Sequence, residues 1–112
     1  MGEARLAAAV EASALIRIAQ AQGGFGAVLH KGDAERGALL IVVLERGVLH
    51  TMLARQFDGV RYAWAPLPID VADSANAQLF LEKRKRNDPD EWQIELDIPS
   101  AQRLVAEMTS TG

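Results

Sequence analysis

The chain has 112 residues, which is enough for one domain with a single hydrophobic core that needs no disulfides. Its formal charge of −3 differs from the basic surface typical of nucleic-acid-binding proteins, so a nucleic-acid partner is not expected. Without cysteine, the sequence forms no disulfide framework, thiolate zinc site or thiol nucleophile. We therefore expect a single cytoplasmic domain over residues 1–112.

The N-terminal part of the sequence predicts a helix over residues 3–22. Eight alanines lie in this range, and glycines at 23 and 24 end it. Its length resembles that of a signal peptide, but Glu11 and Arg17 interrupt the apolar stretch, so we expect neither an export signal nor a membrane span. Glu11 is interpreted as an edge residue with a salt-bridge partner. The spacing of the apolar residues predicts a buried face made of Ala7, Val10, Ala14, Ile18 and Ala21.

Four strand patterns follow, at residues 27–31, 38–45, 48–57 and 60–65. The turn signals between them are Gly32-Asp33, Arg46-Gly47 and Asp58-Gly59, which predict an antiparallel meander. A two-residue loop at Asp58-Gly59 would place Phe57 opposite Val60. The continuous apolar run at 38–45 predicts a strand that is covered on both faces.

The alternation of side chains gives this sheet two apolar faces, and both need a cover. We expect the first two helices to cover one face well and the last helix to cover the other only in part. The exposed patch would then exceed what monomers usually leave open, and a two-fold homodimer would bury it. The candidate dimer face consists of Leu40, Val42, Val48, His50 and Met52.

The remaining segments predict a helix, a strand and a short helix. Asp70 or Asp73 could cap a helix that runs to about residue 86. Residues 92–98 alternate in polarity like a half-exposed strand, and Pro99-Ser100 opens the last helix. The order is α-β-β-β-β-α-β-α. It predicts an α+β fold with an antiparallel sheet of about five strands and three helices.

No motif in the sequence points to a defined chemistry. The glycines at 23–37 do not have the spacing of a phosphate-binding loop, and the helix precedes the strand instead of following it. His30, Asp33 and His50 are not fixed by spacing as a metal site. The basic run at 83–86 fans around the helix and has acidic neighbours. We expect no metal, cofactor, catalytic residue or membrane contact.

Two stretches, ASALIRIAQAQGGFGAVLHKGDAERGALLIVV at 12–43 and RNDPDEWQIEL at 86–96, together resemble a bacterial family known as domain of unknown function 1491. The resemblance implies a cytoplasmic bacterial protein, and it supplies no activity. It draws attention to Gly32, Asp33, Asp88, Asp90 and Trp92 as a candidate surface for a ligand or partner.

Two hypotheses about function remain open. The first is a non-catalytic binding or assembly module that self-associates, with an unknown protein as a further candidate partner. The second is a small enzyme or ligand-binding domain that uses the Gly32-Asp33 turn and the Asp88–Trp92 segment. The second hypothesis requires these two segments to converge around a pocket.

Overall fold

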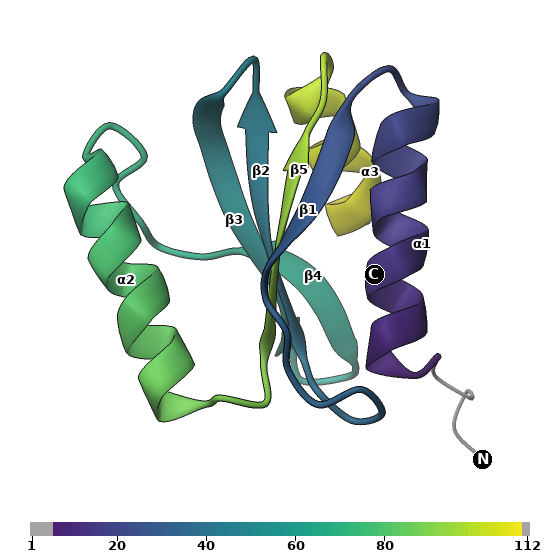
Figure 1. Cartoon of the computed structure of the whole chain (residues 1–112), viewed down its shortest axis with the longest axis vertical. Helices are drawn as coiled ribbons and strands as arrows, with labels where there is room; N and C mark the ends of the chain where they lie inside the picture. The colour runs from purple at the N-terminus through teal and green to yellow at the C-terminus, as the bar shows by residue number, and fades with distance from the viewer. Residues whose placement is uncertain (1–5, 111–112) are drawn as a thin grey trace.

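A computed structural model describes residues 6–110, so residues 3–5 of the predicted first helix lie outside the described part (Figure 1). The order of elements confirms the predicted α-β-β-β-β-α-β-α. The elements are α1 (Ala8–Ala21), β1 (Phe25–His30), β2 (Leu39–Glu45), β3 (Val48–Phe57), β4 (Tyr62–Pro66), α2 (Ser74–Asn87), β5 (Trp92–Asp97) and α3 (Ala101–Ser110). Asp73 caps α2 as expected, since its side chain accepts a hydrogen bond from the backbone N–H of Asn76.

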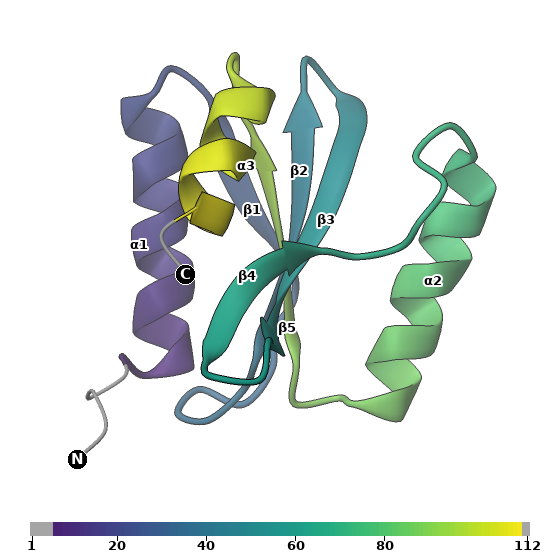
Figure 2. The same ribbon diagram turned by 180° about the vertical axis from the view of Figure 1, so that it is seen from behind.

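The five strands form one sheet in the order β1-β5-β2-β3-β4. Strand β5 pairs antiparallel with β1 and parallel with β2, and the other pairings are antiparallel. Figures 1 and 2 view the sheet along its plane from opposite sides. The β1 edge faces the viewer in Figure 1, and the β4 edge faces the viewer in Figure 2. The prediction of a half-exposed strand at 92–98 was wrong, because β5 lies between two strands, and even its polar Gln93 and Asp97 are buried.

Helices α1 and α3 pack on one face of the sheet, and α2 packs on the other (Figures 1 and 2). The predicted placement of the first two helices on one face was therefore wrong. Phe25 pairs with Asp97, so β1 begins where β5 ends, and α1 leads into the sheet at the corner from which α3 leaves it. From that corner both helices pack against the same core residues, and α2 packs against the residues of the other face.

The predicted dimer face is largely covered within the chain. Leu40, Val42 and Met52 are 0%, 5% and 1% exposed, because they pack with residues of α2 and of the segment before it. Val48 and His50 are exposed. Val48 pairs with Glu45, whose side chain accepts a hydrogen bond from α3, so Val48 lies on the other face, and His50 is the unpaired residue of a bulge in β3. The assignment of these five residues to one open face was wrong.

Two smaller predictions also differ from the structure. The β3–β4 loop has four residues, and Phe57 pairs with Tyr62 instead of Val60. The Asp58 side chain holds this loop by accepting the backbone N–H groups of Val60 and Arg61 at 2.9 and 3.0 Å. The buried face of α1 is rotated from the predicted one and consists of Ala8, Ala12 and Ala19, with Leu15 and Ile16 beside them.

Within the described residues, every helix is too short or too polar to cross a membrane.

Candidate functional site

The two segments highlighted by the sequence lie against each other at the end of the sheet where β2 and β5 begin. The Asp33 backbone N–H donates to the Asp90 carbonyl at 2.9 Å, and the Trp92 indole N–H donates to the Asp33 carbonyl at 2.8 Å. His30 Nε2 lies 2.9 Å from the carbonyl oxygen of Pro89. The turn after β1 and the segment before β5 therefore form one unit.

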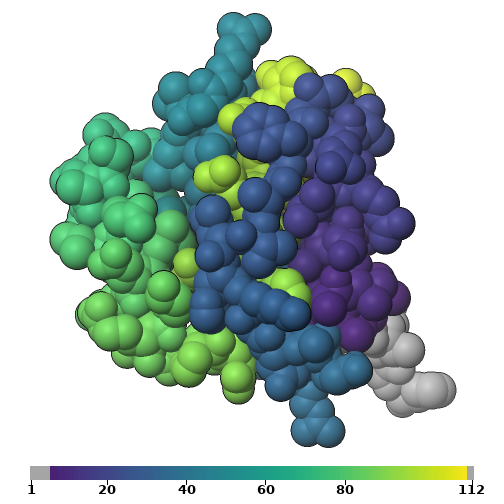
Figure 3. All heavy atoms as spheres, viewed as in Figure 1, coloured from purple at the N-terminus to yellow at the C-terminus, as the bar shows by residue number. Residues whose placement is uncertain are grey.

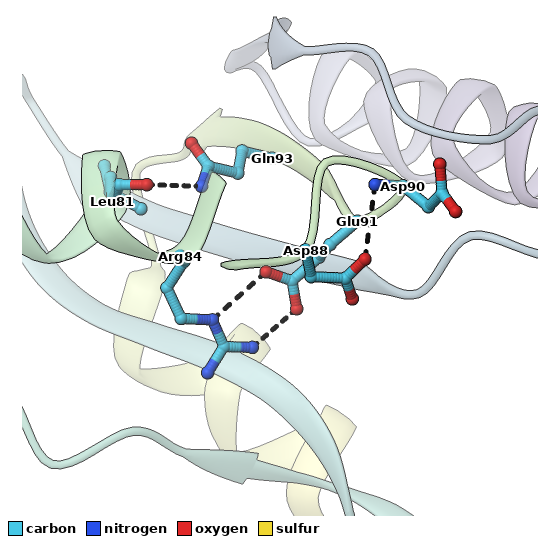
Figure 4. A network of polar contacts seen from close by, with 6 residues as sticks. All are labelled: Leu81, Arg84, Asp88, Asp90, Glu91 and Gln93. Carbon is cyan, nitrogen blue, oxygen red and sulfur yellow. Dashed lines mark hydrogen bonds and ion pairs between the residues drawn. The ribbon is translucent and has the colours of Figure 1, made fainter. Parts of the chain in front are cut away.

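The highlighted side chains mainly hold this unit together. The Asp33 carboxylate accepts the backbone N–H groups of Arg36 and Glu35 at 2.8 and 2.9 Å, and these hydrogen bonds lower the pKa of Asp33. The Asp88 carboxylate accepts the Asp90 backbone N–H (Figure 4). Both carboxylates therefore fix the backbone of their own segment.

Gly32 and Trp92 are fixed by close packing. A Cβ atom on Gly32 would lie 2.1 Å from the Asp90 carbonyl oxygen, so only glycine fits where the two segments meet. Trp92 is 4% exposed and belongs to the core under α1 and α3. Both residues shape the site and present no free functional group.

Beside this unit lies a pocket of about 400 Å³. The residues that line it come from five places in the fold. These are the start of α1, the stretch 35–39, the paired strands β3 and β4, helix α2, and the residue before β5. Six charged side chains line it, in equal numbers of each sign: Glu11, Glu35, Arg36, Arg55, Arg84 and Glu91.

The first ion pair of the pocket joins α1 to β3. Arg55 Nη1 donates to Glu11 Oε1 at 2.9 Å, and Arg55 Nη2 donates to the second carboxylate oxygen. The Arg55 guanidinium also lies over the Trp64 ring, 4.3 Å from its centroid. The salt-bridge partner expected for Glu11 is therefore Arg55, whose position on β3 the sequence alone did not connect to the helix.

The second ion pair joins the last turns of α2 to the segment before β5 (Figure 4). Arg84 Nε and Nη2 donate to the two oxygens of Glu91 at 3.1 and 2.5 Å. Glu91 is almost completely buried, and its hydrogen bonds raise the pKa of Arg84. The basic run at 83–86 carries no sign of this pairing in the sequence, because an ion pair across a turn has no periodic pattern.

Glu35 and Arg36 differ from the other four charged residues. They lie exposed in the turn after β1, and neither makes an ion pair with another residue in the described range 6–110. Their side chains are therefore available to a ligand. The pocket thus combines two fixed ion pairs with one free cation and one free anion, and it also contains apolar wall from Leu39, Ala54 and Tyr62.

No group of three metal-binding side chains occurs among the residues that the structure describes. His30 faces the 88–92 segment, whereas His50 lies at the bulge in β3, so the two histidines belong to different ends of the sheet.

The model of a family of proteins of unknown function (DUF1491) matches residues 6–106 of the chain. A DUF1491 family protein from Caulobacter crescentus CB15 has a similar crystal structure, with a TM-score of 0.70 and 28% identity over 84% of this chain and 87% of that one. An NMR structure of a DUF1491 family protein from the same organism gives a TM-score of 0.72 and 29% identity over 86% and 89% of the two chains. The solution structure of protein Atu0922 from A. tumefaciens shares the fold, with a TM-score of 0.69 and 24% identity over 84% and 86%. No curated protein matches the chain.

Proposed function

This chain belongs to the DUF1491 family, and we propose that it is a cytoplasmic, non-catalytic binding module whose pocket takes a small zwitterion, such as an amino acid or a short peptide. The observation that carries the proposal is the lining of the pocket. Three arginines and three glutamates from α1, the turn after β1, β3, α2 and the residue before β5 surround a space of about 400 Å³. That volume falls in the range of pockets for small ligands.

The balance of charge favours a ligand that carries both signs. A ligand with a net negative charge would be attracted by the three arginines and repelled by the three glutamates, and the reverse holds for a cation. Arg36 can hold a carboxylate through its planar fork of N–H donors, and the neighbouring Glu35 can accept an ammonium group. The exposed ring of Tyr62 offers apolar contact to the remainder of such a ligand.

The same groups favour binding over catalysis. Guanidinium groups stay protonated at physiological pH and transfer no protons. Glu11 and Glu91 each accept two hydrogen bonds from an arginine, so their oxygens are engaged in holding the walls together. The pocket therefore presents fixed charges for recognition.

The proposal is tested by NMR titration of the ¹⁵N-labelled protein with a panel of amino acids and dipeptides. We expect shifts of the amides at 35–38 and around Arg55 and Glu91. Arg36→Ala and Glu35→Ala should abolish these shifts without unfolding the protein, because both side chains are exposed. Arg17→Ala is the matched control, since Arg17 is an exposed arginine on α1 that does not line the pocket.

Two results would contradict the proposal. One is the absence of shifts in the pocket with every zwitterion up to about 10 mM, a concentration that would detect even millimolar affinity. The other is a response that survives in both Arg36→Ala and Glu35→Ala.

A further inference from the structure

We propose that two copies of this chain pair through β1, antiparallel and about a two-fold axis, so that the two sheets become one continuous sheet. Strand β1 is an edge of the sheet, and its only neighbour among residues 6–110 is β5. Its outer side therefore carries backbone N–H and C=O groups that no described strand satisfies. Such groups are a template for another strand.

The side chains of β1 do not block this edge. Its sequence, FGAVLH, contains no lysine, arginine, aspartate or glutamate, whereas edge strands are usually protected by charge or proline. Phe25, Val28 and Leu29 are 56%, 45% and 46% exposed. Figure 3 looks onto this edge and shows the residues of β1 uncovered between α2 and α1.

The opposite edge is protected in the usual way. Strand β4 has five residues and ends in Pro66, which has no N–H to donate. The chain then turns away from the edge, and the Leu67 N–H donates to Met52 in β3. Arg61 and Asp58 bring charge to the loop before β4. The contrast between the edges indicates β1 as the side that receives a partner.

The occupant that fits best is a second copy of β1. Side chains alternate along the strand, so one face carries Phe25, Ala27 and Leu29 and the other carries Gly26 and Val28. A two-fold axis at Ala27 places each side chain opposite a side chain of the partner on the same face. Ala27 then lies beside the partner's Ala27, Phe25 lies beside the partner's Leu29, and Gly26 lies beside the partner's Val28. Each pair joins apolar groups, and a glycine leaves room for a β-branched side chain.

The expected affinity is modest. In the pairing with β5, the register of β1 is regular over the four residues 25–28, and the bulge at Leu29 keeps the strand short. A strand of this length buries less than the roughly 800 Å² per partner of a standard interface. We therefore expect a dimer that forms with rising concentration instead of an obligate one.

The test is the mass of the protein by light scattering and sedimentation from about 10 µM to about 1 mM, a range that brackets small interfaces. We expect the mass to rise from 12.1 kDa towards twice that value. Ala27→Lys and Ala27→Glu should each remain monomeric, because like charges would face each other at the axis. An equimolar mixture of the two variants should dimerise again, which a purely destabilising effect would not produce.

Matched phenylalanines separate this edge from general hydrophobic association. Phe25 and Phe57 are 56% and 58% exposed. Phe25 lies on the edge strand β1, whereas Phe57 lies at the far side of the sheet, at the end of β3 beside the other edge strand β4. Phe25→Lys should raise the dissociation constant of the dimer at least about tenfold, and Phe57→Lys should leave it unchanged. A mass of 12.1 kDa throughout the range would overturn the proposal, as would a dimer that Phe57→Lys disrupts and Phe25→Lys does not.

Discussion

Replacing Trp92 by alanine should destabilise the protein more than any other single change near the candidate site. The side chain is 4% exposed and packs in the core beneath α1 and α3. Truncating a buried tryptophan costs about 3–5 kcal/mol of unfolding free energy. At about 4 °C per kcal/mol for a domain of this size, the melting temperature should fall by about 12–20 °C.

A second variant separates the hydrogen bond of Trp92 from its packing. Trp92→Phe keeps most of the ring but leaves the Asp33 carbonyl without the N–H that lies 2.8 Å away. That carbonyl still accepts the Gly37 N–H at 3.2 Å, so the variant loses one hydrogen bond, which costs about 0.5–1.5 kcal/mol, and its stability should fall between those of wild type and Trp92→Ala.

The assay is thermal unfolding followed by circular dichroism, with Trp64→Phe as the control. Trp64 is only partly buried, and its loss should cost less. The reasoning fails if Trp92→Ala melts within about 2 °C of wild type, since a core residue would then carry less than about 1 kcal/mol.

The other predictions concern the polar contacts. Arg84→Met should cost about 2–3 kcal/mol in urea unfolding, because it leaves the buried Glu91 carboxylate without a partner, and Arg84 itself is one-third exposed. Glu11→Gln should cost at most about 1 kcal/mol, as its pair with Arg55 is partly solvated; a larger loss than for Arg84→Met would contradict this ranking. The lowered pKa of Asp33 stabilises the fold above the unfolded value of 3.8, and this contribution is lost as pH falls through the lower folded pKa. Asp33→Asn should therefore show a smaller drop in urea midpoint between neutral and acidic pH than wild type, and an unchanged drop would refute the assignment.

The order and type of the elements could be predicted because each depends on local signals. Glycines end α1, Asp73 caps α2, and the apolar run of β2 identifies a strand buried on both faces. The faces of β3 and β4 were also predictable near their shared loop. Although that loop is two residues longer than expected, a shift of two residues keeps every side chain on its face.

The strand order and the helix placement could not be predicted, because they depend on contacts between distant residues. No local feature of β5 indicates that it lies between β1 and β2. That insertion decides which helices share a face, and hence that α2 covers Leu40, Val42 and Met52. The bulge at His50 likewise changed the position of Val48 without any glycine to signal it.

The candidate site was predictable in part. The resemblance directed attention to the 32–37 and 87–92 segments, which do meet, but it pointed to residues that hold them together. The side chains that line the pocket come from α1, β3 and α2 as well, and ion pairs such as Arg84–Glu91 leave no pattern in the sequence. Only the folded arrangement brings these charges together.

The position of β5 also governs how the chain can be made. Strand β1 has β5 as its neighbour, and 61 residues separate His30 from Trp92. During synthesis, β1 therefore cannot join the sheet until residues 92–97 have left the ribosome, whereas β2, β3 and β4 can pair as soon as they emerge. The helix α1 and the apolar strand β1 must wait without their final contacts for most of that time. Closure of this long loop is a non-local and entropically costly step, and until it occurs the apolar strand β1 stays without its partner strand.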